Sequence, residues 1–574
     1  MVDSIYDKLS KERKSLQEQG LAPEWMTTGG FQLFKEKYQY GTDKSYRGQC
    51  ERISDTAARH TDDYEGWKPR FFNLLWKGWL SCSTPVLANM GTGRGLPVSC
   101  SGGCVEDSIE GFYDARKEAA LLTKYGFGTS SYLGSIRPRG STFGDGGSCT
   151  GVVPVLKGFI QDSRDVSQGG VRRGAWAGYI EAEHGDFWEV ADHLLNHPDD
   201  NNIGWIIGDE FVQRLQSNDS DALVRYQRIC KIKMVTGKGY FFFKDKVNRA
   251  RPQCYKELGL DVKASNLCNE IRLFSDDNHT FTCVLSSLNL SYYDDWKHTD
   301  AVEVATVFLD CVAEEFIQRA KGIKGLEKAV RFTEKSRALG LGVCGFHTLL
   351  QKRMLPFGSF EAHMLNNEIF SLIKERAEKA STTLAEQFKE DWIGDEWNNH
   401  TPWSDGVKHN THLIAIAPTK STALIMGGVS EGINPDYAMV YTQATSAGEV
   451  ERVNPQLLKI MKERGVFKKE IIDDIAMNYK GSVQHVDWLS PEEKEVFKTA
   501  FEINQFDILR LAASRQKWID QGQSLNLFFS ADEEESYISS VFKEAFTNED
   551  IHGIYYVYSE SGVSASKGEC VACQ

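Results

Sequence analysis

Strand-like and helix-like segments alternate through most of this chain. Between about residue 80 and residue 530, short apolar stretches punctuated by glycine, such as "ALGLGVCGF" and "THLIAIAPTK", are followed by longer segments with helical periodicity, such as "AVEVATVFLDCVAEEFIQRA". Strands that alternate with helices are typical of α/β folds with parallel strands. No Pro/Gly-rich linker interrupts this region. The pattern therefore predicts one large α/β unit.

Segments of a different kind flank this unit. Residues 1–75 are charged and helical in pattern, and we predict an N-terminal helical region there. Residues 76–530 form the predicted α/β unit, with 436–530 as an appended helical subdomain. Residues 531–574 form a C-terminal segment that includes the Ser/Gly-rich stretch "YSESGVSASKGE". That composition is typical of a flexible tether.

Composition and charge exclude several classes of protein. The chain carries a net charge of −14, which argues against a dedicated binder of nucleic acid or anionic membrane. No stretch reaches the roughly 18 apolar residues of a membrane span, and the first residues lack the apolar core of a secretion signal. Thirteen cysteines in a large chain without such a signal are typical of thiols in a reducing compartment. We therefore expect a cytoplasmic protein.

Two cysteines, Cys570 and Cys573, lie within the last five residues. A terminal thiol oxidises readily and makes a poor structural staple. The fourteen residues from Tyr556 to Cys570 span at most about 46 to 50 Å when extended and about 20 Å as a flexible coil. A dithiol on such a tether predicts a redox group that travels to another site.

The segment "ASNLCNEIRL" places Asn266, Cys268 and Glu270 at alternate positions. In an extended segment such residues share one face, which puts a thiol between an amide and a carboxylate. A carboxylate beside a reactive cysteine can act in acid/base steps on the same substrate. The alternative is an ordinary buried strand cysteine, because cysteine is among the most buried residue types. The spacing leaves both interpretations open.

Cys100 and Cys283 lie in two more strand-like stretches, "GLPVSCSGGCVEDSIEGF" and "TFTCVLSSLNLSYY". A zinc site would have to draw its four ligands from Cys100, Cys104, Cys570 and Cys573. Two of these four cysteines lie at the C-terminus, and because chain termini fray, this is a poor place for half of a tetrahedral zinc site. A non-enzymatic zinc-binding or nucleotide-binding scaffold is the alternative from a different functional class.

Several short motifs carry groups that bind phosphate. "IAPTKSTALIMGG" places hydroxyls and a lysine, Thr419 to Thr422, between an apolar strand and a predicted helix. The start of a helix binds anions, although a Ser/Thr N-cap is the commoner role of such residues. The sequence is not a Walker A motif. Thr84 before a proline, and Arg137, Gln168 and Arg172 on Gly-rich turns, are further candidate donors.

Together these motifs resemble the large, catalytic subunit of aerobic, class I ribonucleotide reductases, which work with a separate radical-generating subunit. The resemblance covers roughly residues 75–574 and rests on "PVSC", "VEDSIEG", "SIRPRG", "SQGGVRRG", "SNLCNEI", "TCVLSSLNL" and "APTKST". It implies a ten-stranded α/β barrel with a central finger loop. It also implies reduction of ribonucleoside diphosphates to 2′-deoxyribonucleoside diphosphates by thiyl-radical chemistry.

The resemblance implies a role for each redox group. Cys268 is the expected thiyl-radical residue, with Asn266 and Glu270 beside it. Cys100 and Cys283 are the pair expected to form a disulfide in each turnover. The tail cysteines, Cys570 and Cys573, are expected to reduce that disulfide again. Adjacent tyrosines in "HGIYYVYSE", Tyr555 and Tyr556, match the family's radical relay, with ordinary aromatic packing as the alternative.

The resemblance also implies binding residues. The expected substrate contacts are Thr84, Ser99, Gly128, Thr419, Lys420, Ser421 and Thr422. The expected contacts of a specificity effector are Asp107, Ser108, Ile109, Arg137, Gln168 and Arg172. The segment before Cys100 does not resemble the family's ATP-binding cone, so we expect no overall on/off control by ATP and dATP.

The implied partners follow from the same resemblance. We expect a small radical-generating subunit, thioredoxin or glutaredoxin, and a homodimer, with no nucleic acid and no membrane. No cofactor is expected to be bound covalently and no metal site is expected, while a dNTP or ATP acts as specificity effector. An adenosylcobalamin-dependent reductase is the alternative enzyme, but it needs no tyrosine relay.

Overall fold

The computed structural model describes residues 5–144, 146–168, 172–200, 202–391, 403, 407–445 and 448–560. The two tail cysteines, Cys570 and Cys573, lie outside the described residues.

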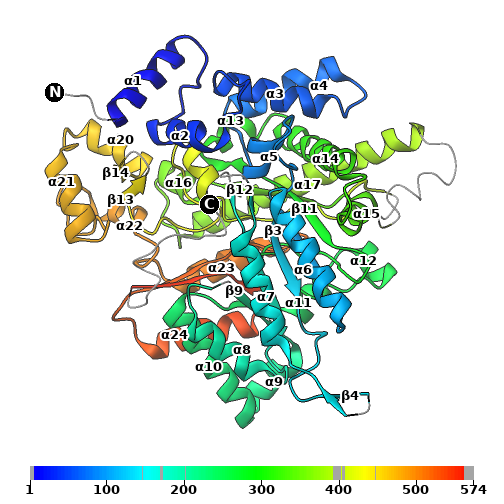
Figure 1. Ribbon diagram of the computed structural model, residues 1–574. Coiled ribbons are helices and arrows are strands. Elements are labelled where there is room, and N and C mark those ends of the chain that lie inside the picture. Colours follow the sequence, from blue (N-terminus) through cyan, green and yellow to red (C-terminus); the bar gives the residue numbers. More distant parts are fainter. Residues whose placement is uncertain are drawn as a thin grey trace.

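A curled sheet lies at the centre of the molecule (Figure 1). Its first half contains the parallel strands β2 (Cys100–Cys104), β3 (Gly128–Tyr132), β8 (Trp176–Glu181), β9 (Asn202–Ile207) and β10 (Tyr240–Phe243). The remaining strands are β11 (Phe281–Asn289), antiparallel to β2, β12 (Leu339–Cys344), parallel to β11, and the edge strands β1 (Leu80–Cys82) and β16 (Gly553–Ile554). Most of these strands are buried along almost their whole length, although several carry polar residues such as the serines and threonines of β3 and β11.

Two extended segments close the sheet into a barrel. Residues 412–416 bond to β12, with 2.9 Å from Leu339 N to His412 O, and Ile416 then pairs with Gln523. Residues 521–529 bond in turn to 553–559, where β15 (Leu527–Phe529) pairs with β17 (Val557–Ser559). The ring thus contains ten extended segments, namely β2, β3, β8, β9, β10, 553–559, 521–529, 412–416, β12 and β11. The ten-stranded α/β barrel expected from the sequence is confirmed.

The glycines of "LGLGVC" in β12 explain how this closure is possible. A Cβ added at Gly342 would lie 2.4 Å from the carbonyl oxygen of Ala415, and one at Gly340 would lie 2.4 Å from a Leu285 methyl group. Only glycine lets the backbone of 412–416 approach so closely.

Helices cover the outside of the barrel (Figure 1). The longer ones are α6 (Ile109–Lys124), α7 (Val152–Asp165), α8 (Phe187–Asn196), α10 (Ser220–Thr236), α14 (Ala301–Ala320), α17 (Phe360–Asp391), α23 (Gln505–Gln516) and α24 (Glu535–Thr547). Helix α14 is buried along most of its length because it packs between the barrel and the N-terminal helices. Its almost continuous apolar sequence suits that position.

The N-terminal region is helical, as the sequence predicts. Its main helices, α1 (Ile5–Glu18), α3 (Tyr46–Ala58) and α4 (Tyr64–Trp76), lie across the top of the barrel in Figure 1.

Residues 436–500 form a lobe at the left of Figure 1. Its elements include the hairpin of β13 (Val440–Thr445) and β14 (Gly448–Val453), and the helices α20 (Pro455–Glu463) and α22 (Pro491–Val496). The lobe has its own apolar cluster, which includes Leu457. The sequence predicted a mostly helical segment and missed the hairpin, whose strands are mainly polar. The domain boundaries given above stay a prediction.

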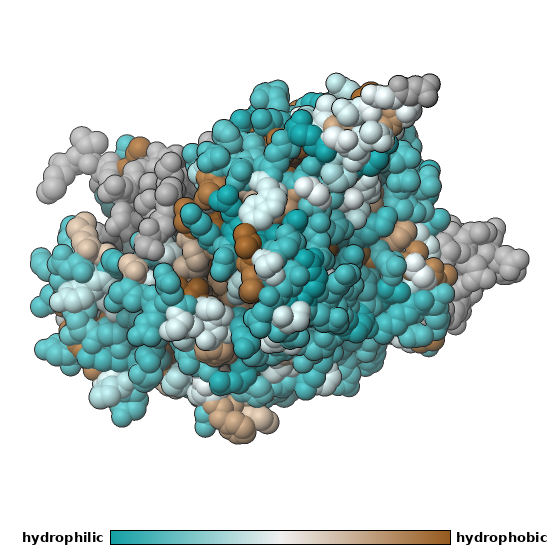
Figure 2. Space-filling model, turned by 90° about the horizontal axis from the view of Figure 1, so that it is seen from below, coloured by the Kyte–Doolittle hydropathy of each residue, from teal (hydrophilic) through white to brown (hydrophobic). Residues whose placement is uncertain are grey.

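The surface seen from below is mainly hydrophilic, with hydrophobic side chains in small groups (Figure 2). In the described part of the chain, no helix combines the length and the hydropathy of a bilayer span.

Candidate active site

A turn carries the predicted reactive thiol. The sequence predicted an extended segment here, and that was wrong. Residues 267–269 form a turn in which Asn269 N donates to Asn266 O at 3.2 Å, and Asn269 has a φ of 63°. Asparagine is one of the few residues that adopt this left-handed region readily. The turn, rather than strand alternation, sets the positions of Asn266, Cys268 and Glu270.

The barrel wall holds this turn from several sides. The contacts are Ser130 Oγ to Ser265 O (2.8 Å), Tyr179 OH to Asn266 O (2.7 Å), Asn269 Nδ2 to Phe241 O (2.9 Å), Ser524 Oγ to Cys268 O (2.8 Å) and Gly522 N to Glu270 O (2.8 Å). These donors and acceptors come from β3, β8, β10 and the 521–529 segment, so the turn lies inside the barrel as a finger loop. A loop fixed on all sides can hold a reactive group in one geometry.

Cys100 and Cys283 are direct cross-strand partners in the antiparallel pairing of β2 and β11. Residues opposite each other in such a pair have Cβ atoms about 4.5–5.5 Å apart, close to the separation found in disulfides. Both cysteines are buried and in the thiol form, and burial raises the pKa of the Cys283 thiol well above its usual value. Asn266 Nδ2 donates to Cys100 Sγ at 3.3 Å, which connects this pair to the finger loop.

Cys104, the second cysteine on β2, lies away from this pair. Four residues of strand separate Cys104 from Cys100, which corresponds to about 13 Å and is too far for a disulfide without rearrangement. Its Sγ donates to Ser275 O at 3.3 Å. The neighbouring Gly102 is required locally, because a Cβ there would lie 2.2 Å from the ring of Phe281.

Glu270 is fully buried beside the thiols. The Ser524 hydroxyl lies 3.2 Å from Glu270 Oε2, while Glu270 Oε1 is buried without a hydrogen-bond partner among the described residues. Burial raises the pKa of this carboxyl from 4.5 to about 7, against the opposing effect of its hydrogen bonds. A carboxyl that titrates near neutral pH is well placed to act as a general base.

This pKa predicts a pH dependence of stability. Between pH 4.5 and about 7 the folded protein holds a proton on Glu270 that the unfolded chain has lost, so rising pH removes stability across this window. The full difference is roughly 3 kcal/mol. In chemical denaturation, Glu270→Gln is expected to gain stability relative to the parent as pH rises from 5 to 8, whereas the exposed Glu24→Gln shows no such trend. Parallel curves for Glu270→Gln and parent would contradict the shifted pKa.

A cavity of about 80 Å³ lies against Cys268, Glu270 and Cys100. Its lining includes most of the predicted substrate contacts, namely Thr84, Ser99, Thr419, Lys420, Ser421 and Thr422. Gly128 is not in this lining; it pairs with Cys100 across β2 and β3, and its N–H donates to Ser99 O at 2.8 Å. The hydroxyl oxygens of Ser81, Ser83 and Ser99 are buried without a hydrogen-bond partner in the described part of the protein. Buried polar atoms without partners around a cavity indicate a polar ligand.

The predicted phosphate-binding motif forms the short helix α19 (Lys420–Ile425) and the residue before it. Thr419 has a φ of 54°, and its Oγ1 accepts a hydrogen bond from Gly432 N at 2.8 Å. This bond holds Thr419 in the left-handed conformation, which costs free energy for a β-branched residue. The strained position lies where the motif reaches the cavity.

Sequence reasoning missed several residues of the site. Gln521 donates to Leu339 O at 2.8 Å, lies 3.6 Å from Cys283 Sγ, and accepts from Arg272 N at 3.1 Å. It therefore connects Cys283 with the finger loop, and nothing in its sequence neighbourhood signals this. Ser81 and Ser83 could have been found, because both lie within three residues before Thr84 in "LSCSTP".

Tyr555 and Tyr556 lie between β16 and β17, with ring centroids 4.3 Å apart. Tyr555 is buried and Tyr556 is half-buried. The buried Tyr240 of β10, which sequence reasoning also missed, contacts both of them.

Four of the predicted effector residues, Asp107, Ser108, Ile109 and Arg137, are exposed or half-buried and lie outside the lining of the cavity. Arg137 forms an ion pair with Asp107, and the Ser108 hydroxyl caps α6 by accepting from Gly111 N at 2.9 Å. Ile109, at the start of α6, is 66% exposed. Gln168 and Arg172 pair through their backbones in the hairpin of β6 (Ser167–Gln168) and β7 (Arg172–Arg173), and β6 contacts α6. The side chains of Gln168 and Arg172 lie outside the described part.

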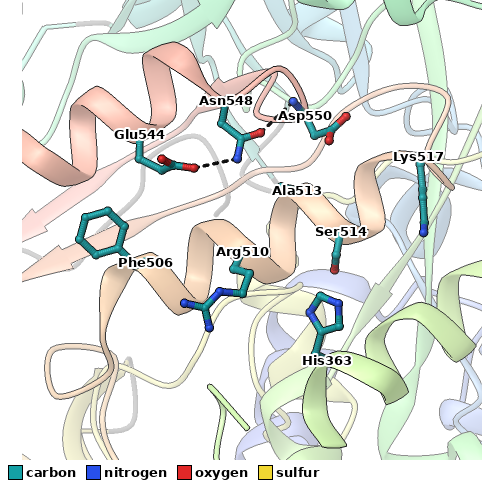
Figure 3. Close-up of a pocket in the computed structure, with 9 residues that line it drawn as sticks. All are labelled: His363, Phe506, Arg510, Ala513, Ser514, Lys517, Glu544, Asn548 and Asp550. Atoms are coloured by element: carbon teal, nitrogen blue, oxygen red, sulfur yellow. Dashed lines mark hydrogen bonds between the residues drawn. The ribbon is translucent and has the colours of Figure 1, made fainter. Parts of the chain in front are cut away.

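A second cavity, of about 560 Å³, lies between α23, α24 and the beginning of α17 (Figure 3). Arg510, Ser514 and Lys517 line one side, and Glu544 and Asp550 line the other. Its lining contains neither a thiol nor any residue that the sequence singled out. The smaller cavity, whose lining includes Cys100 and Cys268, is therefore the candidate active site.

Fold and site together define a thiol-dependent oxidoreductase built on an α/β barrel. Two family models match the chain: "Ribonucleotide reductase, all-alpha domain" on residues 25–95, and "Ribonucleotide reductase, barrel domain" on residues 98–227 and 221–557. The chain belongs to the ribonucleotide reductase family, among its large subunits. The resemblance stated from the sequence motifs is confirmed.

Relatives agree with this assignment. A putative ribonucleoside-diphosphate reductase large subunit of Frog virus 3 is 34% identical over 552 residues, covering 89% of this chain and 94% of the relative. The ribonucleoside-diphosphate reductase large subunit of Caenorhabditis elegans is 30% identical over 613 residues, covering 93% of this chain and 76% of the relative. The solved structure of the Actinobacillus ureae class Id ribonucleotide reductase alpha subunit superposes with a TM-score of 0.85 at 36% identity, covering 95% of this chain and 99% of that one. These relatives give no support to the adenosylcobalamin-dependent alternative.

Proposed function

We propose that this chain is the catalytic subunit of a ribonucleoside-diphosphate reductase, which converts ribonucleoside diphosphates into 2′-deoxyribonucleoside diphosphates. The observation that carries the proposal is the direct cross-strand pairing of Cys100 with Cys283 beside the finger loop that presents Cys268. A dithiol next to a third, separately held thiol provides both a two-electron reductant and a radical site.

The proposed reaction begins at Cys268. A radical that arrives through Tyr556 and Tyr555 removes the hydrogen atom of the Cys268 thiol, and the resulting thiyl abstracts the 3′-hydrogen of the ribose. Glu270 takes the proton of the 3′-hydroxyl, a role suited to a carboxyl whose pKa burial raises to about 7.

Reduction completes the cycle. The 2′-hydroxyl leaves as water, and the thiols of Cys100 and Cys283 together give up two protons and two electrons. Their disulfide forms as the 2′-carbon gains hydrogen. Cys268 then returns a hydrogen atom to the 3′-carbon, so that its thiyl is regenerated. The balance is one diphosphate and one dithiol converted into one deoxynucleotide, one water and one disulfide.

The polar cavity supports a phosphorylated sugar as substrate. We assign Thr84, Ser99 and Gly128 to the ribose side, and the segment Thr419–Thr422 to the diphosphate. The orphaned serine oxygens described above supply partners for hydroxyl and phosphate groups. The Lys420 ammonium adds positive charge where the diphosphate binds.

The effector proposal rests on surface residues. A dNTP or ATP is proposed to bind at Asp107, Ser108, Ile109 and Arg137. Its signal would reach the active site through the hairpin of Gln168 and Arg172, which contacts α6.

Recycling is assigned to the tail. Cys570 lies ten positions after Glu560, which corresponds to a span of at most about 33–36 Å. Cys570 and Cys573 would reduce the Cys100–Cys283 disulfide by thiolate attack and mixed-disulfide exchange, and thioredoxin or glutaredoxin would then reduce the tail.

The class I relatives support a small radical-generating subunit as partner and a homodimer as the assembly of this chain. We place the enzyme in the cytoplasm, because the proposed chemistry needs Cys268 as a thiol and the Cys100–Cys283 disulfide to be reduced after each turnover, which a reducing compartment favours.

The decisive assay is formation of deoxynucleotide from CDP. We expect the purified chain to be inactive alone and active with a class I radical-generating small subunit. Activity with adenosylcobalamin and no second protein would contradict the proposal.

Control by dATP gives a separate prediction. The effector residues assigned above are the one nucleotide site that we propose outside the active site, so dATP is expected to act through that specificity site. With CDP, UDP, ADP and GDP assayed in parallel, micromolar dATP should change the preference among them without stopping the enzyme. Strong inhibition of all four would reveal a regulatory site that the assigned residues do not include.

A further inference from the structure

Tyr240 is ringed by three other tyrosines, of which Tyr179 and Tyr555 are buried and Tyr556 is half-buried. Its ring centroid is 4.9 Å from that of Tyr555 and 5.7 Å from that of Tyr556. Its ring centroid is also 6.4 Å from that of Tyr179, whose hydroxyl donates to Asn266 O at 2.7 Å. Tyr240 is therefore near both the proposed relay pair and a residue that is bonded to the finger loop two positions before Cys268.

The strand around Tyr240 shows that its hydroxyl is not needed to fill space. The sequence of β10 is "YFFF", and the next three positions fill the core with phenylalanine. Tyr240 is fully buried as well, and taking a phenol hydroxyl out of water costs free energy that a phenyl ring avoids. A phenol can give up an electron together with its proton, which a phenyl ring cannot do.

A buried lysine fixes the backbones of these tyrosines to one another. Lys233 of α10 donates to Tyr555 O and to Gly239 O, each at 2.8 Å, and Gly239 directly precedes Tyr240. Lys233 is fully buried, and such a group ties together the chain segments whose carbonyls it satisfies. The contact between Tyr240 and Tyr555 is thus held from the backbone as well as by ring packing.

We propose that Tyr240 is a third redox-active tyrosine, which shares the radical with Tyr555 and Tyr556. The inference rests on the proposed function, since the one-electron oxidant comes from the partner subunit. In the step, a phenoxyl radical on Tyr556 accepts one electron and one proton from Tyr240. The O–H bond of Tyr240 breaks, an O–H bond forms on Tyr556, and the radical resides on Tyr240 until the reverse transfer or transfer to Tyr555.

The direct test introduces 3-aminotyrosine, which is more easily oxidised than tyrosine, at position 240 of the full chain. The variant is mixed with the radical-generating small subunit, CDP and effector, and examined by electron paramagnetic resonance. We expect an aminotyrosyl signal that grows as the partner's radical signal declines. The same substitution at Tyr556 serves as the positive control. At Tyr255, which is buried in the same apolar cluster but packs against His412, no signal is expected.

The outcomes separate the two proposals. A signal at position 556 but not at 240 overturns the role of Tyr240 and leaves the relay intact. No signal at either position overturns the relay, and the role of Tyr240 with it. A signal at both but also at Tyr255 means that any buried tyrosine is oxidised, which contradicts a specific role.

A second variant guards against misfolding caused by the added amino group. Tyr240→Phe keeps the ring and removes the oxidisable hydroxyl. We expect kcat to fall by at least about threefold, with an unchanged KM for CDP and an unchanged melting temperature, while Tyr255→Phe retains the parent kcat. Parent kcat in Tyr240→Phe would show that position 240 serves only for packing.

Discussion

Cys268→Ser is expected to abolish deoxynucleotide formation while CDP and effector bind as in the parent. An O–H bond is much stronger than an S–H bond, so the relay cannot form the oxygen-centred radical. A barrier raised by only about 4 kcal/mol already slows a step about 10³-fold. Steady-state assays with the complete two-subunit enzyme should therefore show less than about 10⁻³ of the parent rate.

A matched control for this variant is Cys230→Ser. Cys230 is a partly buried cysteine on α10 outside the cavity, and a serine hydroxyl can replace its contact with Tyr226. It should retain the parent rate. Turnover of a few per cent or more in Cys268→Ser, with Cys230→Ser normal, would rule out Cys268 as the radical site.

The tail and the buried pair should respond differently to the loss of one cysteine. In Cys570→Ser or Cys573→Ser, the first turnover of pre-reduced enzyme is expected to be normal, because the reducing thiols Cys100 and Cys283 are intact. Later turnovers driven by thioredoxin should stop. Dithiothreitol should partly restore cycling, because a small dithiol diffuses to the buried disulfide without a tether.

Changing Cys100 or Cys283 should instead prevent normal product in the first turnover. These two residues are cross-strand partners, and Cys100 lines the cavity, so loss of either one removes the proposed reductant. Rapid-quench measurement of dCDP in the first turnover distinguishes the two classes of variant. Loss of first-turnover product in a tail variant that folds normally would mean that the tail belongs to the active site.

Much of the candidate site could be predicted from local sequence motifs. "SNLCNEI", "PVSC", "TCVLSSLNL" and "APTKST" are short, and each keeps its reactive residues within a few positions of one another. Their resemblance to one family was therefore enough to predict the barrel and to bring three distant cysteines into one hypothesis. The alternation of strand and helix signals supported the α/β class but not the number of strands.

What the sequence did not reveal depends on distant contacts and on irregular backbone. Gln521 reaches Cys283 across 238 residues, and no local pattern encodes such a pairing. Tyr240 begins the apolar run "YFFF", which carries no functional signal, and only the fold places it against Tyr555. The finger loop was predicted as extended because alternation of polar residues suggests a strand, whereas the left-handed Asn269 bends it into a turn.

The central claim is that Cys100 and Cys283 supply the electrons for ribonucleotide reduction. The most direct measurement uses the double variant Cys570→Ser, Cys573→Ser, pre-reduced, freed of reductant, and mixed with the small subunit, effector and CDP. After quenching and thiol trapping, dCDP is counted and disulfides are mapped by mass spectrometry. The account predicts one dCDP for each Cys100–Cys283 disulfide formed. Formation of dCDP while both cysteines remain thiols, or with a disulfide that joins either of them to another residue, would contradict it.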